Sequence, residues 1–125
     1  MLAEVMEVVA GRRFPQQRAV LAGYRRRLLR GVVYPGIVPA ASESVEGVLF
    51  EGLDPPALTR LDRFEDVIYE RRELRVTVAS GESLAAFVYV LRPEHASHLT
   101  DAPWDEAEFR VRHLRDYLVA ASSAP

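Results

Sequence analysis

Apolar residues recur at every third or fourth position in three separate stretches of the chain, and this spacing predicts helices. The first stretch covers residues 2–10 and is followed by Gly11, a typical C-cap. The second runs from Pro55 to Phe64 after Asp54, which suits an N-cap, and the third runs from Asp105 to Ala121. Helices are therefore expected early, in the middle and at the end of the chain.

The first half of the chain between these helices is rich in β-branched and aromatic residues, which favours strands. Residues 18–34 carry this composition but are interrupted by Gly23 and Gly31. Residues 35–39 contain two prolines and predict a loop or an edge strand, because proline fixes its own φ and restricts the residue before it. Residues 45–50 are β-forming and predict a core strand.

Strict alternation in the second half predicts two more strands, Tyr69–Val78 and Ser83–Leu91, joined by a hairpin turn at 80–82. The whole pattern indicates an α+β protein, mostly antiparallel, built as a small barrel or a sheet with short helices. At 125 residues we expect one domain, over 1–121, with a tail at 122–125.

The composition excludes several classes of functional site and of binding partner. Without cysteine there is no disulfide, thiolate metal site or cysteine nucleophile. A net charge of -2 argues against a dedicated nucleic-acid binder. No apolar run reaches the roughly 20 residues of a membrane helix, and no signal peptide is evident, so we expect no membrane association and a cytoplasmic location.

Glu65 is the strongest candidate for acid/base chemistry. It lies where the second predicted helix ends and the chain turns toward a strand, and partial burial there would raise its pKa toward the range a general acid/base needs. The alternative is an ordinary surface carboxylate at a helix end. Asp62, three residues earlier, is expected to pair with Arg60 or Arg63 or to solvate the helix.

Tyr69 and Arg71 share one face of the strand that follows. The guanidinium of Arg71 could bind a substrate carboxylate in a bidentate manner, and the Tyr69 phenol could donate a hydrogen bond. A ladder of Arg and Glu on a solvated strand face is the alternative. The densest basic cluster is split between faces by strand alternation, which disfavours a nucleic-acid stripe; it comprises Arg25, Arg26, Arg27 and Arg30.

The histidines His95, His98 and His113 have no carboxylate or cysteine at a familiar ligand spacing, so we expect structural roles and no metal. No Gly-x-Ser-x-Gly elbow and no Gly-rich phosphate loop occur. Trp104 is expected to anchor the last helix by packing.

Taken in order, several short motifs resemble the gamma-glutamylcyclotransferase-like family, in the short form found in bacteria and plants. They are Leu21-Ala22-Gly23-Tyr24-Arg25, Tyr34-Pro35-Gly36-Ile37-Val38-Pro39, Val45-Glu46-Gly47-Val48-Leu49, Leu61-Asp62-Arg63-Phe64-Glu65, Tyr69-Glu70-Arg71 and Ala86-Phe87-Val88-Tyr89-Val90. The resemblance implies a small mixed, mostly antiparallel β-barrel with short flanking helices and a cavity at one end.

The resemblance also implies a reaction in which Glu65 takes a proton from the α-amino group of a γ-glutamyl amine or peptide. The freed amine attacks its own γ-carbonyl, giving 5-oxoproline, and no cofactor is needed. On the same basis we expect Tyr34, Tyr69 and Arg71 to bind this small-molecule substrate.

One family feature is missing from the sequence. Family members begin with a strand and a Tyr-Gly loop whose amides hold the substrate, and no Tyr-Gly pair occurs here. We therefore expect weak activity and an exposed sheet edge that a second copy could pair with, as in a homodimer. Two alternatives stay open: a noncatalytic binding or oligomerising member of the same fold, and a two-carboxylate hydrolase using Glu65 with Asp62 or Asp66.

Overall fold

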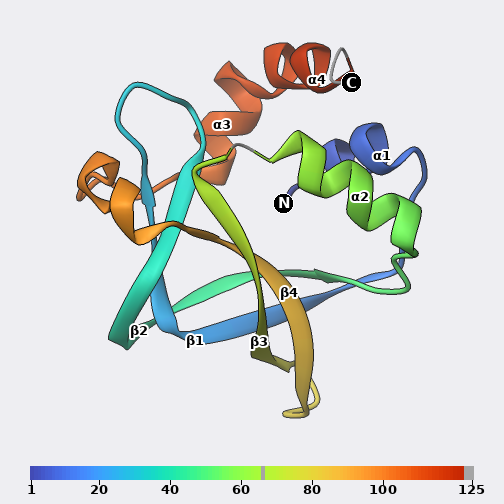
Figure 1. The fold of residues 1–125 in the computed structure, drawn as a ribbon, viewed down its shortest axis with the longest axis horizontal. Helices are drawn as coiled ribbons and strands as arrows, with labels where there is room; N and C mark the ends of the chain where they lie inside the picture. The colour runs from blue at the N-terminus through green and yellow to red at the C-terminus, as the bar shows by residue number, and fades with distance from the viewer. Residues whose placement is uncertain (66, 123–125) are drawn as a thin grey trace.

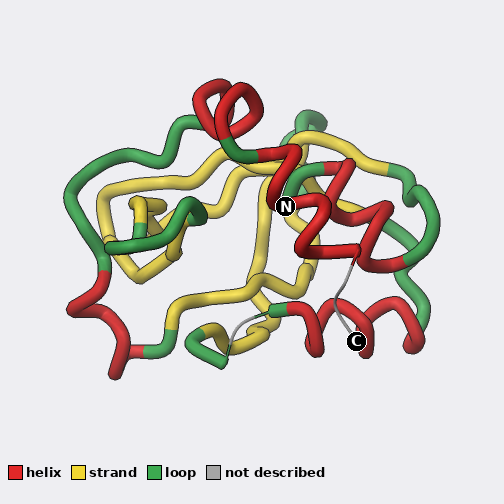
Figure 2. The backbone as a smooth tube through the Cα atoms, turned by 90° about the horizontal axis from the view of Figure 1, so that it is seen from above, coloured by secondary structure: helices red, strands yellow, loops and turns green. Residues whose placement is uncertain are grey.

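The structure is a computed structural model that describes residues 1–65 and 67–122. Four antiparallel strands form a curved sheet, and the helices gather on one side of it (Figure 1). The N-terminal end lies near the middle of the molecule, among the helices (Figure 2). In chain order the elements are α1 Ala3–Ala10, β1 Gln16–Leu28, β2 Pro35–Phe50, α2 Pro55–Phe64, β3 Tyr69–Val78, β4 Ser83–Leu91, the 3-10 helix η1 Pro93–His98, α3 Glu106–Arg112 and α4 Leu114–Ser122.

The sheet has the strand order β2-β1-β3-β4, with every pair antiparallel. The α+β class with mostly antiparallel strands and short helices is thus confirmed. The sheet is not a closed barrel, however, because β2 and β4 remain its two edges. The central strands β1 and β3 pair only at Ala19–Val78 and Val20–Thr77. So short a seam lets the two long hairpins splay apart, and their outer strands do not meet as ladder partners.

A glycine bulge shapes the β1–β2 hairpin. Gly23 has φ 82, a conformation that residues with a Cβ avoid, and the register jumps there from Ala22–Ser44 to Tyr24–Pro39. Gly23 was expected to interrupt the strand, but it bends one continuous strand instead. The proline-rich stretch at 35–39 likewise belongs to β2, an edge strand, where prolines are tolerated.

Helix α2 has the predicted bounds and carries Glu65 at its end. It begins at the N-cap Asp54, whose Oδ1 accepts a hydrogen bond of 3.0 Å from the Ala57 backbone N–H. Its apolar face buries Ala57 and Leu61 against α1 and Phe14. The backbone N–H of Glu65 still bonds to the carbonyl of Leu61 at 2.9 Å, so the last turn fixes where Glu65 leaves the helix.

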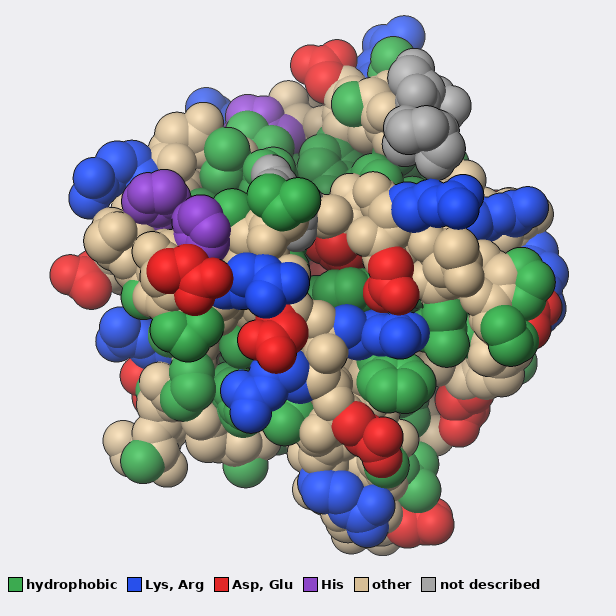
Figure 3. Space-filling model, in the orientation of Figure 1, with side chains coloured by type: hydrophobic (Ala, Val, Ile, Leu, Met, Phe, Trp, Pro, Cys, Tyr) green, Lys and Arg blue, Asp and Glu red, His purple; other side chains and the backbone are tan. Residues whose placement is uncertain are grey.

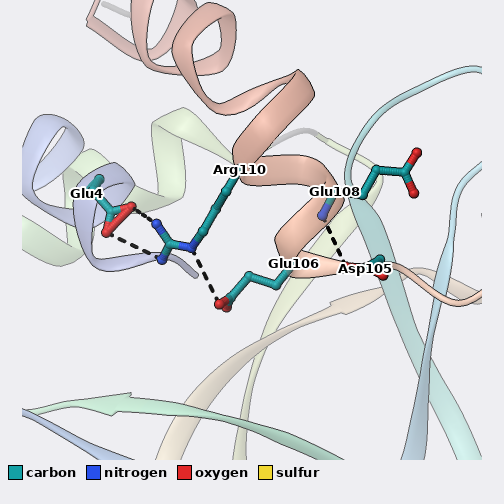
Figure 4. Close-up of polar contacts among 5 residues, drawn as sticks. All are labelled: Glu4, Asp105, Glu106, Glu108 and Arg110. Atoms are coloured by element: carbon teal, nitrogen blue, oxygen red, sulfur yellow. Dashed lines mark hydrogen bonds and ion pairs between the residues drawn. The ribbon is translucent and has the colours of Figure 1, made fainter.

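The single terminal helix expected over 105–121 is two helices, α3 and α4, broken at His113, which has φ -130. At 3.6 residues per turn, an unbroken helix would set Phe109 and Tyr117 about 80° apart around its axis. The break brings their ring centroids to 5.4 Å, so both rings enter the core. Arg110 of α3 also forms an ion pair with Glu4 of α1 (Figure 4). Of the tail expected at 122–125, Ser122 belongs to α4 and the rest lies outside the described residues.

The core consists of three apolar clusters. One lies between α1 and α2, and a second lines the sheet around Leu21, Val45 and Val76. The third is built on the buried residues Leu2, Val5 and Phe109. Its aromatic side chains, hereafter the aromatic cluster, are Phe64, Trp104, Phe109 and Tyr117. This cluster positions the side chains described next.

Candidate active site around Glu65

Glu65 is the C-cap residue of α2 and is half-buried. Its backbone is already extended there, with φ -66 and ψ 139, so the chain leaves the helix toward β3 at this residue. The preceding residue, Phe64, packs in the aromatic cluster at 6.0 Å from Tyr117. Glu65 is therefore held at the edge of a packed region and is not a fully solvated side chain.

Three tyrosines from different parts of the chain meet close to Glu65. The Tyr34 ring lies 6.4 Å from Tyr69 and 6.3 Å from Tyr117, measured between centroids. Tyr69 Oη donates a hydrogen bond of 2.6 Å to the carbonyl of Pro35, which ties the start of β3 to the start of β2. The predicted substrate-binding residues Tyr34 and Tyr69 are thus neighbours in space.

The negative charge of Glu65 affects the pKa of two half-buried phenols, those of Tyr117 and Tyr89. Burial raises the pKa of Tyr117 to about 12, and the negative charge of Glu65 and the nearby Tyr34 add to that shift. Burial also raises the pKa of Tyr89, with the hydrogen bond to Asp62 next and a smaller effect from Glu65. Both phenols therefore stay protonated near neutral pH, and that of Tyr89 already donates its proton to Asp62.

The third predicted binding residue, Arg71, lies in a polar group at the side of Tyr89. Tyr89 Oη donates a 2.6 Å hydrogen bond to Asp62 Oδ1, and Arg71 Nε lies 3.6 Å from the same oxygen. The guanidinium also lies 4.6 Å above the Phe87 ring. Asp62 was expected to pair within its helix, but it bridges α2 to the β3–β4 hairpin instead. The alternation of residues along β3 suggested a ladder of Arg and Glu, but it could not indicate that Arg71 contacts Asp62 of α2.

The α-amino nitrogen of Met1 also lies near Glu65. Burial lowers its pKa, while the charges of Glu65 and Glu106 oppose that shift and the charge of Arg26 reinforces it. Met1 as a whole residue is 43% exposed. Charges of both signs, from Glu65, Glu106 and Arg26, therefore act on the α-amino nitrogen of Met1.

Two cavities open among the described residues. One, of about 120 Å³, opens beside Trp104 and Val33, and one of about 350 Å³ opens between α1 and the start of β1, beside Glu7 and Phe14. Glu65 lines neither of them. Its carboxylate is thus held among the tyrosines and not at the wall of either cavity.

Sequence reasoning missed Tyr89 and Tyr117. The signal for Tyr89 was present, because a hairpin turn centred on Ser80 pairs Arg71 with Tyr89 and puts both on one face. Tyr117 carries no local signal, since its approach to Tyr34 depends on the break between α3 and α4. Asp66, considered earlier as a second carboxylate, lies outside the described residues.

The remaining candidates show structural contacts. The rings of His95 and His98 lie 5.6 Å apart, and within 1–65 and 67–122 no three His, Asp or Glu side chains gather in a way that suits a metal ion. Trp104 packs 5.5 Å from Phe109 and its indole N–H donates to the carbonyl of Val33 at 3.1 Å, which agrees with its expected anchoring role.

On the face seen in Figure 3, Arg side chains are interspersed with acidic ones and do not gather in one area. Among the described helices, none has the length and apolar character required to cross a bilayer.

Comparison with known proteins places this arrangement in a family. The family model described as "Gamma-glutamyl cyclotransferase, AIG2-like" matches residues 1–106. AIG2-like protein C of Arabidopsis thaliana is 34% identical over 118 residues, which is 94% of this chain and 68% of that protein. A solution structure from Arabidopsis thaliana superimposes with a TM-score of 0.72 at 29% identity, covering 96% of this chain and 73% of that one.

A solved gamma-glutamyl cyclotransferase shares the fold with a TM-score of 0.54 at 14% identity, over 87% of this chain and 73% of that one. The motifs from Leu21 to Val90 that suggested the resemblance all fall inside the matched residues. This chain belongs to the gamma-glutamyl cyclotransferase, AIG2-like family.

Proposed function

We propose that this protein cyclises small γ-glutamyl compounds to 5-oxoproline, with Glu65 as the general base. The observation that carries the proposal is a half-buried carboxylate at the end of α2, close to the phenols of Tyr89 and Tyr117, in a chain of this family. Partial burial and neighbouring phenols suit a carboxylate that must gain and lose a proton during turnover.

In the proposed reaction, Glu65 accepts a proton from the α-ammonium group of the substrate. The freed nitrogen attacks the γ-carbonyl carbon and forms the new C–N bond of the five-membered ring. The bond from that carbon to the leaving nitrogen then breaks, and the leaving amine takes the proton from Glu65. The ring nitrogen gives up its second proton to the same amine, so the products are the neutral ring amide of 5-oxoproline and an ammonium ion. Because nucleophile and electrophile belong to one molecule, correct orientation supplies much of the acceleration.

The residues around Glu65 have proposed roles in that orientation. The phenols of Tyr34 and Tyr69 line the approach to Glu65, and Arg71 contributes positive charge at its side. Asp62 holds Arg71, since Arg71 Nε lies 3.6 Å from Asp62 Oδ1. The domain that carries this function is proposed to span residues 1–121.

The test is release of 5-oxoproline from γ-glutamyl-alanine, followed by mass spectrometry. Glu65→Gln keeps the shape of the side chain but removes the base, so we expect a fall of about 10² to 10⁴ in kcat. Glu70→Gln is the matched control, because Glu70 is an exposed carboxylate on β3. No 5-oxoproline from the wild-type protein, or equal release by the Glu65→Gln variant, would contradict the proposal.

A further inference from the structure

Arg26 of β1 faces the interior of the fold. In the β1–β2 register it lies directly opposite Ile37, and opposed residues project to the same side of a sheet. Ile37 packs against the apolar cluster of the sheet, so Arg26 rises from the core-facing side and is half-buried. An arginine in that position is uncommon unless its charge has a partner.

The described residues give this guanidinium no carboxylate partner within ion-pair distance. Its Nη1 donates a 3.3 Å hydrogen bond to the carbonyl of Glu46, and its Cζ lies over the Trp104 ring, 5.2 Å from the centroid, as in a cation–π contact. Burial lowers the pKa of Arg26, and the more distant charges of Glu106 and Glu46 oppose that shift. By contrast, the adjacent Arg27 forms a 2.9 Å ion pair with Glu43. A guanidinium has five donors, so most of those on Arg26 have no acceptor within residues 1–65 and 67–122.

Arg26 lies at the opposite end of the aromatic cluster from Glu65. Trp104, over which Arg26 lies, belongs to the same cluster as Phe64, the residue before Glu65. The charges of Arg26 and of Glu65 also act on one shared point, the α-amino nitrogen of Met1. A cation with no carboxylate partner among the described residues and a carboxylate that could act as a base therefore flank one aromatic cluster, at its two ends.

We propose that Arg26 binds a carboxylate of the substrate and so makes this protein selective for anionic γ-glutamyl compounds. The inference rests on the function proposed above. A planar guanidinium held over an aromatic ring matches a carboxylate through two parallel hydrogen bonds. A γ-glutamyl amino acid offers two such groups, the α-carboxylate of the glutamyl part and the carboxylate of the leaving amino acid.

Three substrates distinguish these two sources. γ-Glutamyl-alanine has both carboxylates, γ-glutamyl-ethylamide has only the α-carboxylate, and 4-aminobutyryl-alanine has only the carboxylate of the leaving group and would close to 2-pyrrolidone. For Arg26→Met we expect KM for γ-glutamyl-alanine to rise on the order of 10- to 100-fold, as for loss of a charge-assisted contact. The single-carboxylate substrate whose KM rises equally identifies the carboxylate that Arg26 binds. A change in KM of less than about 2-fold on all three, or an equal fall in kcat on all three with KM unchanged, would overturn the inference.

Two further variants keep the result interpretable. Arg30→Met removes an exposed arginine that lies two residues beyond the end of β1, and we expect KM to stay unchanged. Arg26→Lys keeps the charge but not the planar fork, so it should restore only part of the affinity. Thermal melts of each variant show whether the fold is intact.

Calorimetric binding of γ-glutamyl-alanine separates a failure of this inference from a failure of the proposed function. If the wild-type protein binds the compound without turning it over, the proposed reaction is wrong. Binding that weakens at least 10-fold in Arg26→Met but not in Arg30→Met would still support the role of Arg26. Equal binding in all variants, or no binding by the wild-type protein, would contradict it.

Discussion

Tyr89 on β4 donates a 2.6 Å hydrogen bond to Asp62 on α2, and this contact fastens the helix that carries Glu65 to the open end of the β3–β4 hairpin. The phenol is half-buried while the carboxylate is partly exposed, at 43% of its side chain. The contact thus ties the candidate base to the sheet through one side chain from each element.

Tyr89→Phe should loosen that tie. It removes the donor but keeps the ring, so we expect a loss of about 1 kcal/mol in the free energy of unfolding, the usual net value of a hydrogen bond. Urea denaturation measures this loss. Tyr24→Phe, a tyrosine on β1 that packs against the apolar cluster of the sheet, is the control. Equal stability of the Tyr89→Phe variant and the wild type would show that the contact contributes nothing.

Stability should fall in alkali because of Tyr117. Its pKa is raised to about 12 in the folded protein, against about 10 in an unfolded chain. The folded state therefore holds a proton that the unfolded state releases above pH 10, so this contribution is complete below pH 10 and is lost as pH rises toward 12. Melting temperatures between pH 9 and 11.5 should fall less steeply for Tyr117→Phe than for the wild type. Parallel curves for the two proteins would disprove the link.

The variant Arg71→Met tests whether the positive charge of Arg71, beside the candidate base, contributes to stability and activity. Because its ion pair with Asp62 is partly exposed, we expect less than about 1 kcal/mol of lost stability. Activity should suffer more, with kcat/KM lower by roughly 10-fold if Arg71 assists the substrate. Arg72→Met, an exposed neighbour on the same strand, serves as the control. The prediction fails if Arg71→Met and Arg72→Met have the same kcat/KM.

Gly36 is a crowded position at the start of β2. A Cβ there would lie 3.3 Å from side-chain atoms of Leu29, Leu91 and Leu99. Gly36→Ala should therefore cost about 1–3 kcal/mol through overpacking and should displace the adjoining Tyr34. Gly47→Ala makes the same change on the same strand where nothing lies within 4 Å, and a smaller loss is expected. Chemical denaturation compares the two, and equal losses would mean that crowding is not the cause.

Local patterns in the sequence were sufficient for most elements. Helix α2 and strands β3 and β4 were predicted to the residue, because Asp54 caps the helix and strict alternation marks the two strands. The prediction that failed, a closed barrel, concerned a long-range feature. The sheet stays open because β1 and β3 pair over so short a seam, at Ala19 and Val78, and no local motif indicates over how many residues two strands will pair.

The same limit applies to the site. Glu65, Tyr69 and Arg71 are close in sequence, and their proximity could be expected from a helix running into a strand. Asp62 bonding to Tyr89, 27 residues away, could be found only from the hairpin register. The approach of Tyr117 to Tyr34 depends on packing of the last helix, which the sequence does not encode locally.

The segment that brings Tyr117 to Glu65 lies beyond residue 106, where the family match ends. The carboxylate and its polar neighbours on the hairpin therefore belong to the shared part of the family, whereas one wall of their surroundings comes from a part that the family model does not constrain. Because Tyr117 of this segment packs on Phe64, a change in the last helix is felt at the end of α2, directly beside Glu65. Family members that differ beyond this point would therefore keep the helix and the hairpin but differ in the packing around this carboxylate.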